Sequence, residues 1–233
     1  MRPFDHKLST VFLVSMVYPL GPAALILMPM LVGGVIDDFG FTEQQAGYMA
    51  SLEGLGLVLA SLAAALWVRK VSWLKVLAGA LIATALLNVL SANLNEFMPL
   101  LVVRFLTGFS GGVIFALTVA ALGDNRHPDR AFGIAQVVQG AMMFFAFAGA
   151  PYVLERWTVS GLFYMLAAAA SLMLLALARY PSAGARRTVA LGAHGAAPNH
   201  SGLIWLGLLA SFLYFANIFG FWTYIERIGQ DAG

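Results

Sequence analysis

The stretch Arg104-Phe-Leu-Thr-Gly108-Phe-Ser-Gly-Gly112 places a permanent charge inside an apolar run from Phe97 to Leu122. Arginine keeps its proton in proteins, and at the centre of a membrane helix it costs about 2.5–3.5 kcal/mol on insertion scales. A chain tolerates that cost when the guanidinium faces a polar cavity or a buried acidic partner. Gly108 and Gly112 follow at steps of four residues, so a neighbouring helix can approach closely on that face. The stretch therefore predicts a working site inside a helical bundle.

The composition predicts an all-α polytopic membrane protein. Of 233 residues, 61% are hydrophobic and only 10% are charged, and the mean hydropathy is +0.84. A helix needs about 20 apolar residues to span a bilayer. Seven runs are long enough to be candidates: 11–33, 46–68, 73–92, 97–122, 131–153, 161–178 and 202–224. The chain has no cysteine, which excludes disulfides, thiol catalysis and thiolate metal sites.

The basic residues predict an orientation in the membrane. Leaving out Arg104, ten of them fall in the N-terminal segment and in the connections after the second, fourth and sixth runs, against two on the other side, Arg156 and Arg227. Since cytoplasmic loops carry the excess of Lys and Arg, we expect a plasma (inner) membrane protein whose N-terminus and 179–201 loop are cytoplasmic. The net charge of +2 reflects this orientation, and no pattern indicates nucleic-acid binding.

The first apolar run contains Pro19, Pro22 and Pro29. Proline removes a helical hydrogen bond and bends the axis, while neighbouring helices can satisfy the freed carbonyl groups. Two interpretations stay open: a broken helix that lines a substrate path, with Tyr18 as a polar contact, or a kinked packing helix.

Glu53, in the second run, is the natural partner for Arg104. If the two helices enter from the same side near Gly47 and Phe97, Glu53 lies about 9 Å and Arg104 about 10 Å deep, at 1.5 Å per residue. We therefore expect the two side chains to pair, or to alternate between pairing and binding a proton or substrate. Burial favours the neutral carboxyl group and the guanidinium favours the carboxylate, an opposition that a protonation switch requires. A static structural ion pair is the alternative.

Other polar residues are weaker candidates for contact with a substrate. Gln136 and Gln139 share a helix face in the fifth run, and Asn217 and Asn88 lie in the seventh and third runs. Each could equally bond another helix. Asp37-Asp38 lacks a third ligand nearby, so we expect a solvated loop and no metal site.

The motif and the order of the helices together resemble the N-terminal half of a major facilitator superfamily transporter. Arg104-x3-Gly108-x3-Gly112 matches the family pattern R-x-x-x-G-x-x-x-G. The stretch 65–75 keeps only the basic character of the family's loop pattern G-x-x-x-D-R-x-G-R-R, without its acidic residue. Gly149-Ala-Pro151 is a remnant of the antiporter pattern G-x-x-x-G-P-x-x-G-G.

The resemblance implies a domain plan and a general function. It implies a six-helix bundle at 1–178, an inter-domain linker at 179–201, and a seventh helix at 202–233 that begins a second bundle. It also implies a proton-coupled secondary transporter of a small organic solute that works by alternating access, with no enzymatic activity and no cofactor. Arg104 would supply the cavity charge and Glu53 the titratable group.

Because the second bundle is mostly missing from these 233 residues, we expect a truncated chain, a fragment, or a second copy that rebuilds the cavity. The main alternative is a non-transporting membrane scaffold or regulatory fragment. Gly108-Phe-Ser110-Gly111 matches the G-x-S-G of rhomboid-type intramembrane serine proteases. All four histidines lie in predicted cytoplasmic segments, so the serine would have no base and that reading is rejected.

Overall fold

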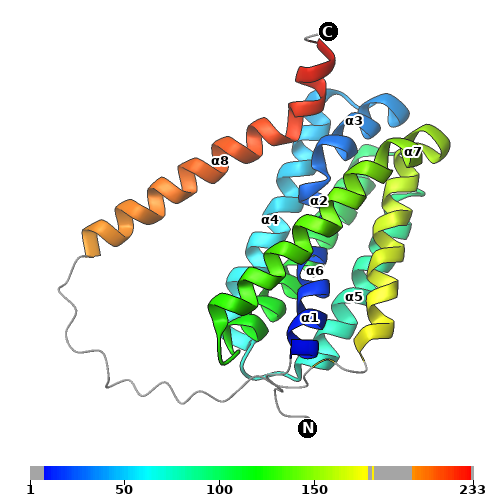
Figure 1. Ribbon diagram of the computed structural model, residues 1–233. Helices are drawn as coiled ribbons and strands as arrows, with labels where there is room; N and C mark the ends of the chain where they lie inside the picture. Colours follow the sequence, from blue (N-terminus) through cyan, green and yellow to red (C-terminus); the bar gives the residue numbers. More distant parts are fainter. Residues whose placement is uncertain (1–7, 178–179, 181–200, 232–233) are drawn as a thin grey trace.

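The computed structural model describes residues 8–177, 180 and 201–231, and the secondary structure in these ranges is helical (Figure 1). The elements are α1 (Leu8–Val17), the 3-10 helix η1 (Tyr18–Leu20), α2 (Ala23–Ile26), α3 (Met28–Phe39), α4 (Glu43–Trp67), α5 (Trp73–Ser91), α6 (Phe97–Gly123), α7 (Pro128–Ala176) and α8 (Ser201–Asp231). The predicted all-α membrane bundle is confirmed. The predicted 179–201 linker lies outside the described residues, apart from Tyr180 and Ser201.

The first apolar run is broken, as its prolines predict. It forms α1, η1, α2 and α3 in succession instead of one straight helix. Pro19 lies in η1, Pro22 precedes α2, and Pro29 lies in the first turn of α3. Proline lacks a backbone N–H, so each position interrupts the ladder of helical hydrogen bonds.

Among the described residues, four helices are long and apolar enough to cross a membrane: Glu43–Trp67, Trp73–Ser91, Phe97–Gly123 and Pro128–Leu175. The last is 48 residues long and contains the fifth predicted span and most of the sixth. It turns back on itself, since Thr158 has non-helical angles (φ 58°, ψ −167°). Figure 1 shows α7 running along the bundle and then returning beside α5. The fifth and sixth predicted helices are therefore the two arms of α7.

The turn of α7 is held by the end of α3. Asp38 Oδ2 accepts a 2.6 Å hydrogen bond from the Val159 amide, one of the N–H groups that a helix start leaves without a partner. A positive φ is strained for a β-branched residue, and the Asp38 contact fixes the backbone at the next residue, Val159. The expectation of a solvated loop at Asp37-Asp38 is partly wrong: both residues are exposed, but they lie in the last turn of α3, and the Asp38 carboxylate anchors another helix.

The loop between α3 and α4 is built from local signals. Gly40 ends α3 in the left-handed conformation (φ 69°), which glycine adopts without steric cost. Thr42 then caps α4: its hydroxyl accepts from the Gln45 amide at 3.2 Å, and its own amide donates to the Gln45 side chain at 3.0 Å. This capping box fixes where α4 begins and hence the position of Glu53 along it.

Two hydrophobic clusters fill the bundle and a polar layer separates them. On α6, Leu100 belongs to one cluster and Ile114 to the other, with Arg104, Thr107 and Ser110 between them. Leu81 on α5 and Ala92, the residue that follows α5, flank the layer in the same way. We call the end with the 40–42 and 92–96 connections the outer end, and the end with the 68–72 and 124–127 connections the inner end, after the predicted orientation.

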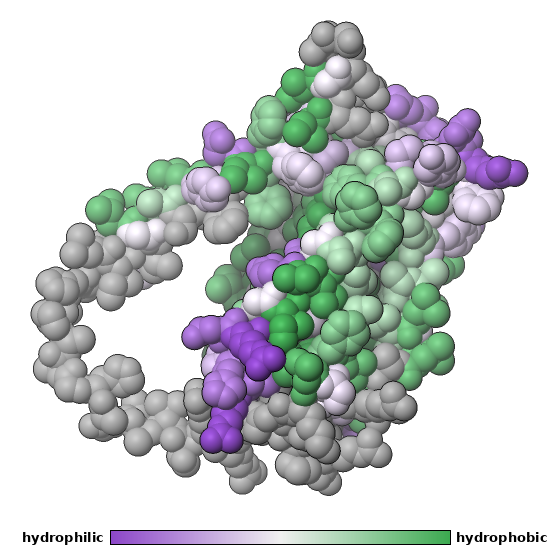
Figure 2. All heavy atoms as spheres, viewed as in Figure 1, coloured by the Kyte–Doolittle hydropathy of each residue, from purple (hydrophilic) through white to green (hydrophobic). Residues whose placement is uncertain are grey.

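The surface has the pattern of a membrane protein. In the face drawn in Figure 2, hydrophobic residues cover the middle of the bundle and hydrophilic residues gather near its ends. Large apolar side chains are exposed on several helices, among them Leu62, Leu66, Val137, Phe144 and Phe145. In water such exposure would be unfavourable, whereas lipid chains cover it at no cost.

Helix α8 leans away from the bundle and meets it near its own C-terminal part (Figure 1). There Trp222 Nε1 donates a 3.0 Å hydrogen bond to the Ile26 carbonyl, and Tyr224 donates one of 3.0 Å to the Glu43 carbonyl. The Trp222 ring also packs edge-on against Phe147. Two polar contacts and one aromatic contact thus join α8 to three separate parts of the bundle.

Candidate functional site

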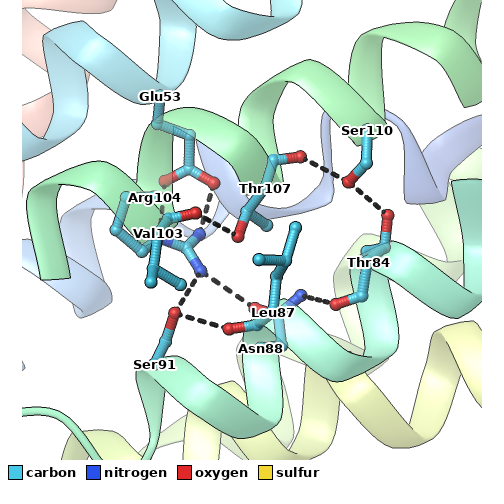
Figure 3. Close-up of polar contacts among 9 residues, drawn as sticks. All are labelled: Glu53, Thr84, Leu87, Asn88, Ser91, Val103, Arg104, Thr107 and Ser110. Carbon is cyan, nitrogen blue, oxygen red and sulfur yellow. Dashed lines mark hydrogen bonds and ion pairs between the residues drawn. The ribbon is translucent and has the colours of Figure 1, made fainter. Parts of the chain in front are cut away.

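The predicted pairing of Glu53 with Arg104 is present in the structure, at the centre of the polar layer (Figure 3). Nε of Arg104 donates to Glu53 Oε2 at 3.1 Å, and Nη2 donates to Oε1. The side chains are 0% and 2% exposed. This two-point contact between α4 and α6 satisfies both charges in a setting where an unpaired charge would be very costly.

Helix α5 completes the binding of the guanidinium. Nη1 of Arg104 donates to Asn88 Oδ1 at 3.0 Å and to Ser91 Oγ at 3.4 Å. The guanidinium carbon lies 5.0 Å from the centre of the Phe163 ring on the second arm of α7, which is cation–π distance. Arg104 therefore contacts α4, α5 and α7 at once, and a substitution at this residue would remove contacts with all three helices.

The predicted close approach at Gly108 and Gly112 is also seen. A Cβ atom on Gly108 would collide with the Glu53 backbone carbonyl, and one on Gly112 would lie 2.7 Å from Ala60 Cβ. From the opposite side, a Cβ on Gly56 would lie 2.8 Å from the Phe109 amide nitrogen. The three glycines let α4 and α6 touch backbone to backbone, and this contact brings Glu53 within reach of Arg104.

Hydroxyl groups extend the polar layer away from the ion pair (Figure 3). Thr84 and Ser110 are 2.8 Å apart, and Ser110 donates to the Thr107 carbonyl at 2.9 Å. His127, the histidine within the described ranges, forms the N-cap of α7 at the inner end. Ser110 thus has hydroxyl and carbonyl partners and, among the described residues, no histidine base.

A small cavity of about 20 Å³ adjoins Glu53, whereas Arg104, the expected cavity charge, is not among its lining residues. Its lining includes Glu53 and also Gly21 and Ala23, at the breaks of the first segment. Gly21 is itself in tight contact with α6, since a Cβ there would lie 2.8 Å from Phe115 Cβ. The breaks in the first apolar run therefore lie beside the buried charges.

The predicted substrate contacts do not form one group. Tyr18 is buried and its side chain lies beside that of Gln136, so these two are brought together. Gln136 itself is exposed, and Gln139 is half-buried with an Oε1 that has no partner in the structure. Asn217 is exposed on α8. Tyr18, Gln136 and Gln139 remain candidates, while Asn217 is placed apart from them on another element.

An acidic partner exists at the inner end although the 65–75 loop has none of its own. Arg69 Nη2 donates to Asp124 Oδ1 at 2.8 Å, and its guanidinium lies 5.9 Å from the Trp73 ring centre. This hydrogen bond raises the pKa of Arg69 above its ordinary value. Asp124 follows α6, so the contact ties the end of the arginine-bearing helix to the α4–α5 connection.

Sequence reasoning missed several members of the polar layer. Ser91 and Thr84 received no role, and Asn88 was a weak candidate for a substrate contact, whereas it binds Arg104. The signal was present in the spacing: Thr84, Asn88 and Ser91 recur at steps of four and three in an otherwise apolar helix, which places them on one face. No comparable sequence pattern indicated that Phe163 would contact Arg104.

Comparison with known families agrees with this arrangement. The family model described as Major Facilitator Superfamily, a family of membrane transporters that are generally not enzymes, matches residues 10–233. No curated protein matches the chain. The match covers nearly the whole chain, including the broken first segment, the helix that carries Arg104 and α8. The chain therefore belongs to the Major Facilitator Superfamily, and its general function is that of a membrane transporter.

Proposed function

We propose that this protein moves a small organic solute across the plasma (inner) membrane by proton-coupled secondary transport with alternating access. The observation that carries the proposal is the buried Glu53–Arg104 pair beside a cavity and a broken helix. Ionisable groups are costly at membrane depth and mark ion or substrate paths, and transporters place their sites at interrupted helices near the bilayer centre.

The contacts of the pair suggest how coupling works. With Glu53 ionised, its carboxylate neutralises Arg104. When Glu53 takes up a proton, the guanidinium loses its counter-charge but keeps Asn88 and Ser91, so it becomes available to an acidic or strongly polar group of the solute. Arg104 is then the cavity charge, Glu53 the proton site, and Gly108 and Gly112 the contact that holds them together.

Three further residues define where the solute would touch the protein. Tyr18 and Gln136 meet between η1 and α7, and Gln139 lies one turn further along with an unpartnered oxygen. We propose these three as solute contacts. For Asn217 we propose a contact only in a state in which α8 has moved toward the bundle, since it is exposed in this one.

The test is flux of a mixed solute panel in proteoliposomes with an imposed pH gradient. Glu53→Gln keeps a hydrogen-bonding group of similar size but cannot titrate, so we expect gradient-driven flux to be lost. Glu96→Gln, a change at an exposed glutamate in the α5–α6 connection, is the matched control and should leave flux unchanged. Gradient-driven flux that persists in Glu53→Gln would contradict proton coupling through this residue, and its absence from the folded wild-type chain would contradict the transport proposal.

A further inference from the structure

The cavity beside Glu53 has the size and lining of a water site. Its volume is about 20 Å³, and an internal cavity needs about 10–15 Å³ to hold one water molecule. Four buried polar residues contribute to the lining: Glu53, Thr84, Asn88 and Thr107. Apolar cavities of proteins stay dry, whereas polar ones of this size bind water that makes two to four hydrogen bonds.

The hydrogen bonds already formed show which groups remain free. Asn88 Nδ2 donates one N–H to the Thr84 carbonyl at 2.8 Å, and its second N–H remains available for another hydrogen bond. The hydroxyl of Ser110 donates its only proton to the Thr107 carbonyl. In the 2.8 Å contact between Thr84 and Ser110, Thr84 is therefore the donor, and both lone pairs of the Thr84 oxygen remain available. Thr107 donates to the Val103 carbonyl and likewise keeps its lone pairs. One spare donor and several acceptors therefore belong to residues that line the cavity.

We propose that a single structural water molecule binds in this cavity, accepting a hydrogen bond from Asn88 and donating to Glu53 and to a threonine hydroxyl. Water is the ligand that fits this inventory because it both accepts and donates. A metal cation fits poorly: the spare Asn88 N–H would point its positive end at the ion, and Arg104 already neutralises the nearby carboxylate.

The bound water also gives Glu53 a partner in both of its charge states, a role that rests on the proposed proton coupling. The carboxylate accepts a hydrogen bond from the water. The protonated carboxyl group needs an acceptor for its new O–H instead, and the same water supplies one by rotating in place. Arg104 is the charged partner of Glu53 among the described residues. It cannot accept a hydrogen bond from the protonated carboxyl group, since arginine has no acceptor. The water thus lets Glu53 change its charge state without leaving its own O–H buried and unsatisfied.

The direct test is an experimental structure of this protein at a resolution that shows ordered water, determined with and without sodium. We expect one density peak in the cavity, within hydrogen-bond distance of Asn88 and of two oxygen atoms, in both preparations. A well-resolved but empty cavity would overturn the proposal. So would a peak that depends on sodium and has the short contacts of a cation.

Two alanines on α7 provide a matched pair of variants. Ala170 lines the cavity, whereas Ala168 is exposed on the same helix. Ala170→Val should remove the density peak and Ala168→Val should retain it; a peak that survives in Ala170→Val would place the water elsewhere. If Ala170→Val does not fold, Thr107→Val replaces it, with Thr118→Val as control, since both threonines bond a carbonyl of α6 and only Thr107 lines the cavity.

Flux measurements separate this inference from the proposed function. Where wild type shows gradient-driven flux, Ala170→Val should reduce it at least tenfold relative to Ala168→Val. Equal flux in the two variants would overturn the role of the water in proton uptake. A water peak in a wild-type chain without gradient-driven flux would leave the binding site standing and contradict the proton coupling.

Discussion

A buried arginine is tolerable here because nearly all of its donors are used. Arg104 has five N–H groups, and the contacts to Glu53, Asn88 and Ser91 engage all three of its nitrogen atoms. Removing one member of a buried ion pair typically costs about 3–5 kcal/mol, because the other charge stays buried without compensation. The pair is therefore a constraint on folding as well as the proposed proton site.

Gly108 is the residue whose replacement should separate the two charged helices. In Gly108→Ala the new methyl group would collide with the Glu53 carbonyl, a backbone atom that cannot rotate away. Overpacking of this kind costs about 1–3 kcal/mol, and more when backbones must shift. We expect a lower unfolding temperature, measured by circular dichroism in detergent, together with loss of gradient-driven flux.

Gly79→Ala is the control for this substitution, since nothing lies within 4 Å of the Cβ position at Gly79 on α5. Alanine is preferred to glycine inside a helix by up to about 1 kcal/mol, so the control should be neutral or slightly stabilised. Equal stability of Gly108→Ala and Gly79→Ala would show that α4 and α6 are not in backbone contact.

At the scale of elements, α8 is held by a contact that the broken first segment makes available. Met30 donates its amide to Leu27 at 3.1 Å instead of continuing the ladder to Ile26, so the Ile26 carbonyl is free to accept from Trp222. Gly47 on α4 leaves room for the Tyr224 side chain, because a Cβ at this position would collide with the Tyr224 hydroxyl. The interruption of one helix thus creates the docking point of another.

The double variant Trp222→Phe/Tyr224→Phe should loosen α8. It keeps both rings but removes two hydrogen bonds, each with a net contribution of about 0.5–1.5 kcal/mol. The chain has no cysteine, so spin labels can be attached to cysteines introduced at two exposed positions, Leu62 on α4 and Leu206 on α8. We expect a broader distribution of label-to-label distances in the double variant.

Phe221→Leu serves as the control, because Phe221 is 56% exposed and its change should leave the distances unaltered. If the double variant gave the same distribution as the control, the docking of α8 would not depend on these two hydrogen bonds.

For the whole molecule, the proposed orientation can be tested by the access of a membrane-impermeant thiol reagent in intact cells. Lys70 and Glu96 are both exposed and lie in connections at opposite ends of the bundle. The excess of basic residues predicts that the Lys70 end faces the cytoplasm. Glu96→Cys should therefore be labelled in intact cells and Lys70→Cys only after permeabilisation. The reverse pattern would contradict the cytoplasmic N-terminus, and labelling of both in intact cells would contradict a membrane between them.

Much of this architecture could be predicted from local signals. The lengths of the apolar runs predict the helices, and the three prolines of the first run predict its breaks, because each acts on the hydrogen bonds of its own segment. The pairing of Glu53 with Arg104 could also be predicted, since a buried charge needs an opposite charge at matching depth. Asn88 and Ser91 as partners of Arg104 could be suspected only from their spacing on α5.

The sequence by itself determined the class of the protein, its helices, and the two charges that must meet. Burial in lipid penalises every polar interruption of an apolar run and every unpaired charge, and both can be recognised locally in the sequence. Only the tertiary structure decided which helices surround the pair. Phe163 reaches Arg104, Asp38 holds Val159 and Trp222 meets Ile26 across long separations in the chain. Such contacts follow from how the helices pack in three dimensions. The shapes of the helices and their free backbone groups determine which residues meet, and no local sequence pattern encodes this.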